Sequence, residues 1–181
     1  METYRIQEGA SLYYMTFTVL DWLPVFINEA SCKIITESLN FCHREKGLRI
    51  NAYVIMPTHL HLVVFDSEFN PNRLSKTVAG FRRFTGHEMV RFWQAHLPSV
   101  FLSGLSASRR SDRQYQFWQQ SRHPEAIWTH AFLQEKVAYL HDNPRRKGLV
   151  RGATDWRFSS AAHWFSDPPG PSDVVLSGVE W

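Results

Sequence analysis

Two histidines one residue apart, His59 and His61, interrupt the apolar run YVIMPTHLHLVVF at residues 53 to 65. Side chains two residues apart point to the same face of a strand, so an extended chain here aims both imidazoles at one spot. Two neutral imidazoles can hold a divalent metal and leave other positions open for substrate oxygens and a third protein ligand. In the competing interpretation, one of these histidines is a core residue hydrogen-bonded to a neighbour.

A tyrosine and an asparagine four residues apart, Tyr139 and Asn143, occur in the stretch VAYLHDNPRRKGLV at residues 137 to 150. On a helix this spacing places the two side chains one turn apart on the same face. The amide oxygen of Asn143 could complete a metal site, and Tyr139 would then project close to the ion. Alternatively, Asn143 ends the helix because it tolerates unusual backbone angles, and Tyr139 is a half-buried aromatic residue. Spacing alone leaves these alternatives open.

A tyrosine oxygen beside a metal can act as a nucleophile that forms a covalent intermediate, which divides one difficult displacement into two easier ones. With a phosphodiester as the electrophile, the metal would polarise the phosphoryl oxygens as a Lewis acid. Free tyrosine has a pKa of about 10, so the phenolate needs stabilisation during the attack. The metal could provide it, and so could Lys136, three residues before Tyr139. The alternative for Lys136 is an ordinary surface lysine.

The elements that must position these residues are indicated by the periodicity of the apolar residues and by turn residues. Strands are predicted over residues 12 to 20, 48 to 56, 59 to 65 and 114 to 120, and helices over residues 28 to 46, 72 to 93 and 129 to 143. Gly47 is expected to stop the first helix and Thr129 to act as the N-cap of the third. Pro144 disfavours helical geometry at the preceding residue, so the third helix is expected to end at Asn143.

The order β-α-β-β-α-β, with an additional C-terminal helix that carries the tyrosine, predicts an α+β fold of the ferredoxin-like type. Its sheet would be antiparallel, with helices on one face. At 181 residues the chain has the size of one domain. We expect a single domain over residues 1 to 165, a basic loop over 95 to 114, and a flexible tail over 166 to 181, which begins with the turn-rich run SDPPGPSD.

Composition favours a globular protein with an anionic partner. The chain is 44% hydrophobic and 14% aromatic, and no apolar run approaches the ~18 residues of a membrane span. The N-terminus lacks the apolar core of a signal peptide, and Cys32 and Cys42 are expected to be packing residues in a reducing compartment. These features predict a cytoplasmic protein. A net charge of +3 and a pI of about 9.0, with clustered Arg and Lys, favour nucleic acid as the partner, although a solvated basic face is the alternative.

The two stretches together resemble a known family. YVIMPTHLHLVV resembles the histidine-hydrophobe-histidine strand of the single-tyrosine HUH endonucleases. YLHDNPRRKGLV resembles the tyrosine helix of the REP-associated tyrosine transposases within that superfamily. The segments FRRFTG, QFWQQSRHPEAIW and DWRFSSA are similar to further blocks of the same family, so the resemblance runs from about residue 12 to 165. Thr58 departs from the family, in which asparagine is usual at this position, and so do Arg145 and Arg146.

The resemblance implies that His59 and His61 are metal ligands, that Asn143 supplies the third ligand, and that Tyr139 is the nucleophile. It further implies cleavage and rejoining of single-stranded DNA at hairpins formed by palindromic repeats, through a 5′-phosphotyrosine link and a free 3′-hydroxyl. The implied metal is Mg²⁺ or Mn²⁺, and no nucleotide cofactor is required. Relatives occur both as monomers and as homodimers that exchange the tyrosine helix. When bound to DNA the protein would be associated with the nucleoid.

Basic residues from three parts of the chain are candidates for phosphate contacts with such DNA. They are Arg73, Lys76, Arg82 and Arg83 of the second helix, Arg109, Arg110 and Arg113 of the basic loop, and the cluster Arg145, Arg146 and Lys147. Two other functions are alternatives. One is a domesticated relative that binds hairpins without cutting them, and the other is a metal-dependent phosphodiesterase without a covalent step.

Overall fold

The computed structural model describes residues 1–5, 12–96, 116–120 and 124–181. Its strands are β1 (Glu2–Arg5), β2 (Leu12–Thr18), β3 (Leu48–Met56), β4 (His59–Asp66), β5 (Glu125–Ile127) and β6 (Ser177–Glu180). Its helices are α1 (Glu29–Lys46), α2 (Pro71–His96), α4 (His130–Arg146) and α5 (Ala161–Phe165), with short 3₁₀ turns at η1 (Leu20–Trp22) and η2 (Ala153–Asp155).

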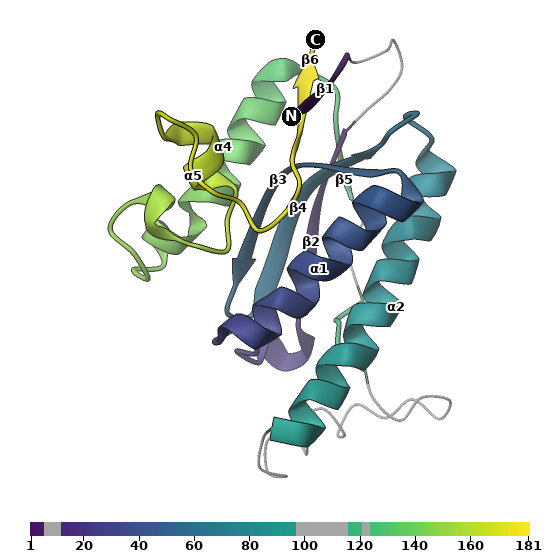
Figure 1. Ribbon diagram of the computed structural model, residues 1–181, viewed down its shortest axis with the longest axis vertical. Helices are drawn as coiled ribbons and strands as arrows, with labels where there is room; N and C mark the ends of the chain where they lie inside the picture. The colour runs from purple at the N-terminus through teal and green to yellow at the C-terminus, as the bar shows by residue number, and fades with distance from the viewer. Residues whose placement is uncertain (6–11, 97–115, 121–123) are drawn as a thin grey trace.

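Four strands form an antiparallel sheet in the order β3-β4-β2-β5. Along the chain, β2-α1-β3-β4-α2-β5 follows the predicted β-α-β-β-α-β order, and α4 comes after it. Figure 1 shows α1 and α2 side by side across one face of the sheet, while α4 and α5 lie on the other side. The prediction of a ferredoxin-like α+β fold with an additional tyrosine-bearing helix is confirmed.

Alternation along β4 separates two apolar clusters, one on each face of the sheet. Leu60, Leu62 and Val64 belong to the cluster beneath α1 and α2. Val63 and Phe65 belong to the cluster beneath α4. Because His59 and His61 have the same parity as Val63, their side chains point to the face that α4 covers.

Local signals fix the ends of the helices. The side chain of Asn28 accepts a hydrogen bond from the Ser31 N–H at 2.8 Å and caps α1. Gly47 ends α1 with a φ of 69°, a left-handed conformation that favours glycine. The predicted cap at Thr129 is also present, because its side chain accepts from the Phe132 N–H. Cys32 and Cys42 are both buried and unpaired, as expected for packing residues.

The fourth strand of the sheet is not the predicted segment 114 to 120. Residues 114 and 115 lie outside the described residues, and from 116 to 120 the chain makes a single bridge, between Trp118 and Val19. The sheet is completed instead by β5, which pairs with Leu12–Tyr14. The alternating pattern was misleading because Phe117 and Trp118 are both buried under α2, where the Trp118 indole N–H donates to the Thr85 hydroxyl.

Helix α4 continues past Pro144 to Arg146, so the predicted end at Asn143 is wrong. The proline lies in the last turn, where its missing N–H removes only one helical hydrogen bond. The turn is closed by the Lys147 N–H on the Asn143 carbonyl and by the Leu149 N–H on the Pro144 carbonyl. The continuation of the helix has a consequence for the site, because Arg146 then lies over the ring of Tyr139.

Residues 166 to 181 pack against the body, which differs from the predicted flexible tail. Val174 and Leu176 are buried. The Asn40 side chain donates from its Nδ2 to the Asp173 carbonyl and accepts at its Oδ1 from the Val175 N–H. Strand β6 then pairs in parallel with β1, which brings the two ends of the chain together (Figure 1). Among the described residues, no helix is both long enough and apolar enough to cross a membrane.

Candidate active site

Strand β4 presents both histidines on the α4 face of the sheet. His59 and His61 are buried, and their ring centroids lie 4.7 Å apart in an edge-on arrangement. The neighbouring strand β2 pairs with β4 so that Thr16 lies directly opposite His61. The prediction that the two imidazoles share one spot on one strand face is therefore confirmed.

Hydroxyl groups occupy the Nδ1 atoms of both histidines. Nδ1 of His61 lies 2.8 Å from the Tyr14 hydroxyl and 2.9 Å from the Thr16 hydroxyl, and Nδ1 of His59 lies 2.8 Å from the Thr58 hydroxyl. A metal-binding histidine in proteins commonly donates from its other ring nitrogen to a polar neighbour, which fixes the ring orientation and the tautomer. In both rings this pattern leaves Nε2 as the atom for a metal.

Both imidazoles are held in the neutral form that a metal requires. Burial lowers the pKa of His59 to about 4, and the positive charge of Lys147 adds to the effect. Burial also lowers the pKa of His61 to about 3, with a further contribution from His59. The pair therefore presents lone pairs, and no positive charge, at neutral pH.

Helix α4 brings Tyr139 to this pair within the same chain. Leu133 and Leu140 are buried in the cluster beneath the helix and orient it, so that the Tyr139 ring lies edge-on to His61 with centroids 6.3 Å apart. The tyrosine side chain remains 45% exposed, which leaves it accessible to a large substrate. Arg146, about two helical turns further on, places its guanidinium 4.6 Å from the centre of the Tyr139 ring.

Two tyrosines lie beside His61, and their surroundings differ. Tyr14 is buried, its hydroxyl is committed to the His61 ring, and burial raises its pKa above the ordinary value. This residue stays a neutral hydrogen-bonding group. Tyr139 is half-exposed and lies beneath a guanidinium. Of these two tyrosines, Tyr139 is thus the one placed to react with a substrate that arrives from solvent.

Asn143 is buried near the end of α4, where its Nδ2 donates to the Tyr139 carbonyl at 3.1 Å. This hydrogen bond uses the donor atom of the amide and leaves the oxygen, the atom that could serve as a ligand. The following turn carries Lys147, whose charge acts on His59. The end of α4 therefore lies on the side of His59, and Asn143 as a metal ligand stays a prediction.

The donor set of this site fits a divalent metal. Two neutral imidazoles with their Nδ1 atoms occupied and one amide oxygen would hold the ion at three positions. Among the described residues no group of three or more His, Cys, Asp and Glu side chains could hold a metal. A metal at this site would therefore need an amide or a substrate oxygen in addition to the two histidines.

Lys136 has a different position from the one that phenolate stabilisation needs. Its ammonium pairs with Glu125 at 2.6 Å and lies 5.0 Å from the centre of the Tyr14 ring. The cation that lies over Tyr139 is Arg146. Sequence spacing suggests the lysine because positions 136 and 139 are one helical turn apart. In the structure its ammonium instead forms an ion pair with Glu125 of β5.

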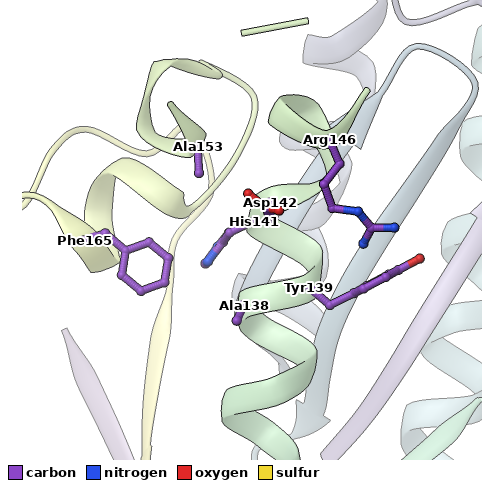
Figure 2. A pocket seen from close by; sticks show the side chains of 7 residues that line it. All are labelled: Ala138, Tyr139, His141, Asp142, Arg146, Ala153 and Phe165. Carbon is purple, nitrogen blue, oxygen red and sulfur yellow. The ribbon is translucent and has the colours of Figure 1, made fainter. Parts of the chain in front are cut away.

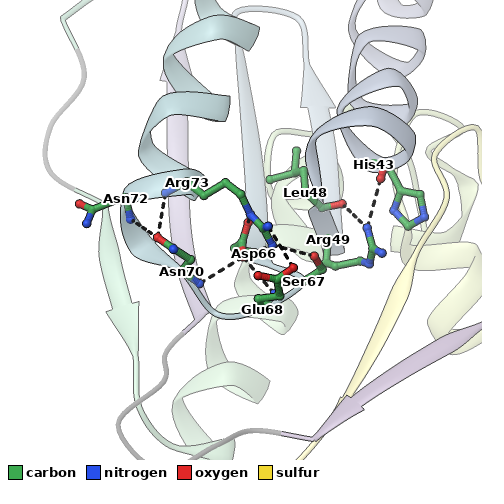
Figure 3. A network of polar contacts seen from close by, with 9 residues as sticks. All are labelled: His43, Leu48, Arg49, Asp66, Ser67, Glu68, Asn70, Asn72 and Arg73. Atoms are coloured by element: carbon green, nitrogen blue, oxygen red, sulfur yellow. Dashed lines mark hydrogen bonds and ion pairs between the residues drawn. The ribbon is translucent and has the colours of Figure 1, made fainter.

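The candidate phosphate-binding residues fall into distinct groups. Arg73 is committed to the fold: its guanidinium pairs with the buried carboxylate of Asp66 at 2.6 Å and also with Glu68, which closes the β4–α2 connection (Figure 3). Arg82 is half-buried and donates to the Gln119 carbonyl. Lys76 and Arg83 are exposed on α2. Arg109, Arg110 and Arg113, in the predicted loop 95 to 114, lie outside the described residues.

Within the part of the chain that the structure describes, the cluster at the end of α4 is the basic group next to the site. Arg145 is exposed and forms an ion pair with Asp142, whereas Arg146 covers the Tyr139 ring and Lys147 influences His59. Beside Arg146 the surface is hollowed by about 440 Å³, between α4 and the η2–α5 segment. Figure 2 shows Arg146 and Tyr139 on one flank of α4, and Phe165 of α5 beside His141, with ring centroids 5.1 Å apart.

Three contributors to the site were not predicted from the sequence. Tyr14 and Thr16 hold His61, and the exposed Trp22 ring lies edge-on to His59 with centroids 5.7 Å apart. A signal existed for the first two, since residues two apart on the strand LYYMTFTVL share a face. The sequence contains no sign of which strand lies beside β4, so their partner could not be identified.

A search of solved structures finds a similar fold in a REP-associated tyrosine transposase bound to a REP hairpin. The match has a TM-score of 0.58 and 18% sequence identity, and it covers 94% of this chain and 89% of that chain. No family model matches the sequence, and no curated protein matches it. At this level of identity the likeness extends to the arrangement of the strands and helices.

Proposed function

We propose that the protein is a metal-dependent endonuclease of the transposase type, which cleaves and rejoins single-stranded DNA beside a hairpin through a covalent bond to Tyr139. The proposal rests chiefly on one observation. Tyr139 is half-exposed and lies edge-on to His61, one of two histidines whose Nδ1 atoms are both hydrogen-bonded to hydroxyl groups. The fold shared with a hairpin-bound tyrosine transposase supports the choice of substrate.

In the proposed reaction the Tyr139 oxygen attacks a phosphodiester and displaces the 3′-oxygen of the preceding nucleotide. One phosphorus–oxygen bond forms and one breaks, which leaves a 5′-phosphotyrosine and a free 3′-hydroxyl. Because one phosphodiester replaces another, the reverse attack by a 3′-hydroxyl can join a new DNA end. No external energy source is needed for either direction.

His59, His61 and the amide oxygen of Asn143 would hold Mg²⁺ or Mn²⁺. The ion would act as a Lewis acid on the phosphoryl oxygens. The protein itself supplies the orientation: Tyr14, Thr16 and Thr58 fix the two imidazole rings, and the buried stripe of α4 fixes the tyrosine above them. Arg146 and Lys147 add positive charge where the phosphate would lie.

Replacement of Tyr139 by phenylalanine tests the covalent step. The assay uses a labelled DNA hairpin with single-stranded flanks in the presence of Mn²⁺, and it detects both cleavage and a protein–DNA adduct on a denaturing gel. We expect the variant to lose cleavage and adduct together while it still binds the hairpin. Tyr13→Phe is the matched control, because Tyr13 packs with the cluster on the opposite face of the sheet.

The same assay separates the alternatives. Cleavage that survives Tyr139→Phe, with no adduct in the wild type, would indicate a phosphodiesterase without a covalent step. Hairpin binding by the wild type with neither cleavage nor adduct would indicate a binding protein. His59→Ala should abolish cleavage while most of the DNA affinity remains, and an unchanged rate would contradict the metal assignment.

A further inference from the structure

Trp22 is an exposed aromatic residue held in an unusual backbone conformation beside His59. The turn Leu20–Leu23 has positive φ at both central residues, 54° at Asp21 and 55° at Trp22, and the Leu23 N–H donates to the Leu20 carbonyl at 3.3 Å. Turns of this type strongly favour Asn or Asp followed by Gly. Asp21 fits this preference, but a tryptophan in the second position is strained.

Burial of the Trp22 side chain does not offset this backbone strain. Its residue surface is 57% exposed, so the ring contributes little to the core. Residues held in sparsely populated backbone regions cluster at binding and active sites, where the surrounding structure enforces them. The ring of Trp22 packs against His59 in a T-shaped arrangement, at 5.7 Å between centroids, and more than half of the Trp22 surface remains open to solvent.

The backbone on both sides of Trp22 is firmly held. The Val19 N–H donates to the Thr58 carbonyl and the Phe26 N–H to the Pro57 carbonyl, each at 3.0 Å. Both acceptors belong to the turn that immediately precedes His59. The Leu20 N–H also donates to the Phe117 carbonyl at 2.8 Å. The indole is therefore presented in a fixed place relative to the histidine pair.

We propose that Trp22 is a stacking platform for an unpaired nucleobase next to the phosphodiester that reacts at His59, His61 and Tyr139. This inference rests on the proposed function. An indole face binds any base by stacking and needs no sequence-specific hydrogen bond. A strand whose phosphate reaches the histidine pair would bring a neighbouring base within range of this ring, and stacking would fix the direction in which the strand leaves the site.

The test measures DNA affinity by fluorescence anisotropy, with a labelled hairpin whose two flanks are four unpaired thymidines. EDTA is present, so that binding is measured without metal. Trp22→Gly removes the ring and suits the positive φ, and its melting temperature should equal or exceed that of the wild type. We expect its Kd to rise roughly 5- to 150-fold, the range of one base–aromatic stack. Trp22→Phe should recover most of the affinity.

Two controls isolate the stack. Trp128→Ala removes an equally exposed tryptophan, 59% accessible, which lies just before the N-cap of α4, and should change Kd less than about twofold. A second hairpin keeps the sugar–phosphate flanks but lacks their bases. Wild type and Trp22→Gly should bind this abasic hairpin with equal Kd, because its flanks offer no base that could stack on the indole.

Each outcome decides the proposal. Equal Kd of Trp22→Gly and wild type for the thymidine-flanked hairpin would overturn it, while the adduct at Tyr139 would still support the proposed function. A loss of the same size on the abasic hairpin, or a loss seen only when Mn²⁺ replaces EDTA, would also overturn it, because the ring would then act through the fold or through His59. If the wild type binds neither hairpin, both inferences fail.

Discussion

The hydroxyl of Tyr14 lies 2.8 Å from Nδ1 of His61, and the two rings stack with centroids 5.5 Å apart. A buried phenol on one strand thus fixes the orientation of a candidate ligand on the next. Thr16, two residues further along β2, reaches the same nitrogen. The support of His61 therefore comes from a strand that is more than forty residues away in sequence.

Removal of the Tyr14 hydroxyl should weaken metal binding more than it weakens the fold. Tyr14→Phe keeps the ring stack but loses one hydrogen bond to Nδ1, so we expect Mn²⁺ affinity to fall by about 10-fold or more, as is typical for outer-sphere partners. The free energy of unfolding should fall by only about 1 kcal/mol. Calorimetric titration with Mn²⁺ and urea unfolding measure the two effects. Unchanged Mn²⁺ affinity in both Tyr14→Phe and Thr16→Val would contradict the role of this contact.

Stability without metal should fall as the pH drops below about 6.5. Burial lowers the pKa of His59 and His141 to about 4 and that of His61 to about 3. Between pH 6.5 and pH 4 the unfolded chain binds protons that the folded chain does not, so the stability present above pH 6.5 is lost on acidification. The loss should be on the order of 1 to 2 kcal/mol for each histidine at pH 5.

Urea unfolding at pH 7.5 and pH 5.0, with a chelator present, measures this loss. His141→Gln should show a smaller difference between the two pH values, because one of the three buried histidines is gone. His141 is a suitable probe, since its Nε2 contacts the Ser160 hydroxyl at 2.7 Å and it lies outside the candidate ligand set. Equal stability at both pH values would show that the histidines are protonated in the folded state.

Arg73 should prove to be a structural residue. Burial acts to raise the pKa of the Asp66 carboxyl, but Arg73 and the N–H groups of Glu68 and Asn70 together hold it below its ordinary value. Arg73→Ala would leave this 2% exposed carboxylate without its cation, so we expect a loss of about 2 to 4 kcal/mol in urea unfolding. Lys76→Ala, an exposed change on the same helix, should cost less than about 0.5 kcal/mol.

Arg146 should contribute to cleavage, whereas its neighbour Arg145 should not. Arg146→Ala removes the guanidinium over Tyr139 and one positive charge near the phosphate, so we expect slower adduct formation and a salt dependence of DNA binding that is reduced by about one unit of slope. Arg145 is paired with Asp142, and Arg145→Ala is the matched control. Equal adduct rates in the two variants would argue against a specific role for Arg146.

The sequence by itself determined the elements whose patterns are local. The run from 48 to 65 became β3 and β4 as predicted, because two long apolar segments around Pro57–Thr58 leave few other conformations. The spacing of His59 and His61 placed both rings on one face, since strand side chains alternate. The helix with Tyr139 and Asn143 on one side also followed from its periodicity and its Thr129 cap.

Only the tertiary structure decided which elements meet. Glu125–Ile127 has no strand pattern of its own and becomes β5 by pairing with the edge of β2. Pro144 stays inside α4 because the turn after it is closed by other hydrogen bonds, and residues 177–180 become a strand because β1 is beside them. Tyr14, Thr16 and Trp22 join the site for the same reason. Contacts between distant segments depend on the packing of whole faces, which no local spacing encodes.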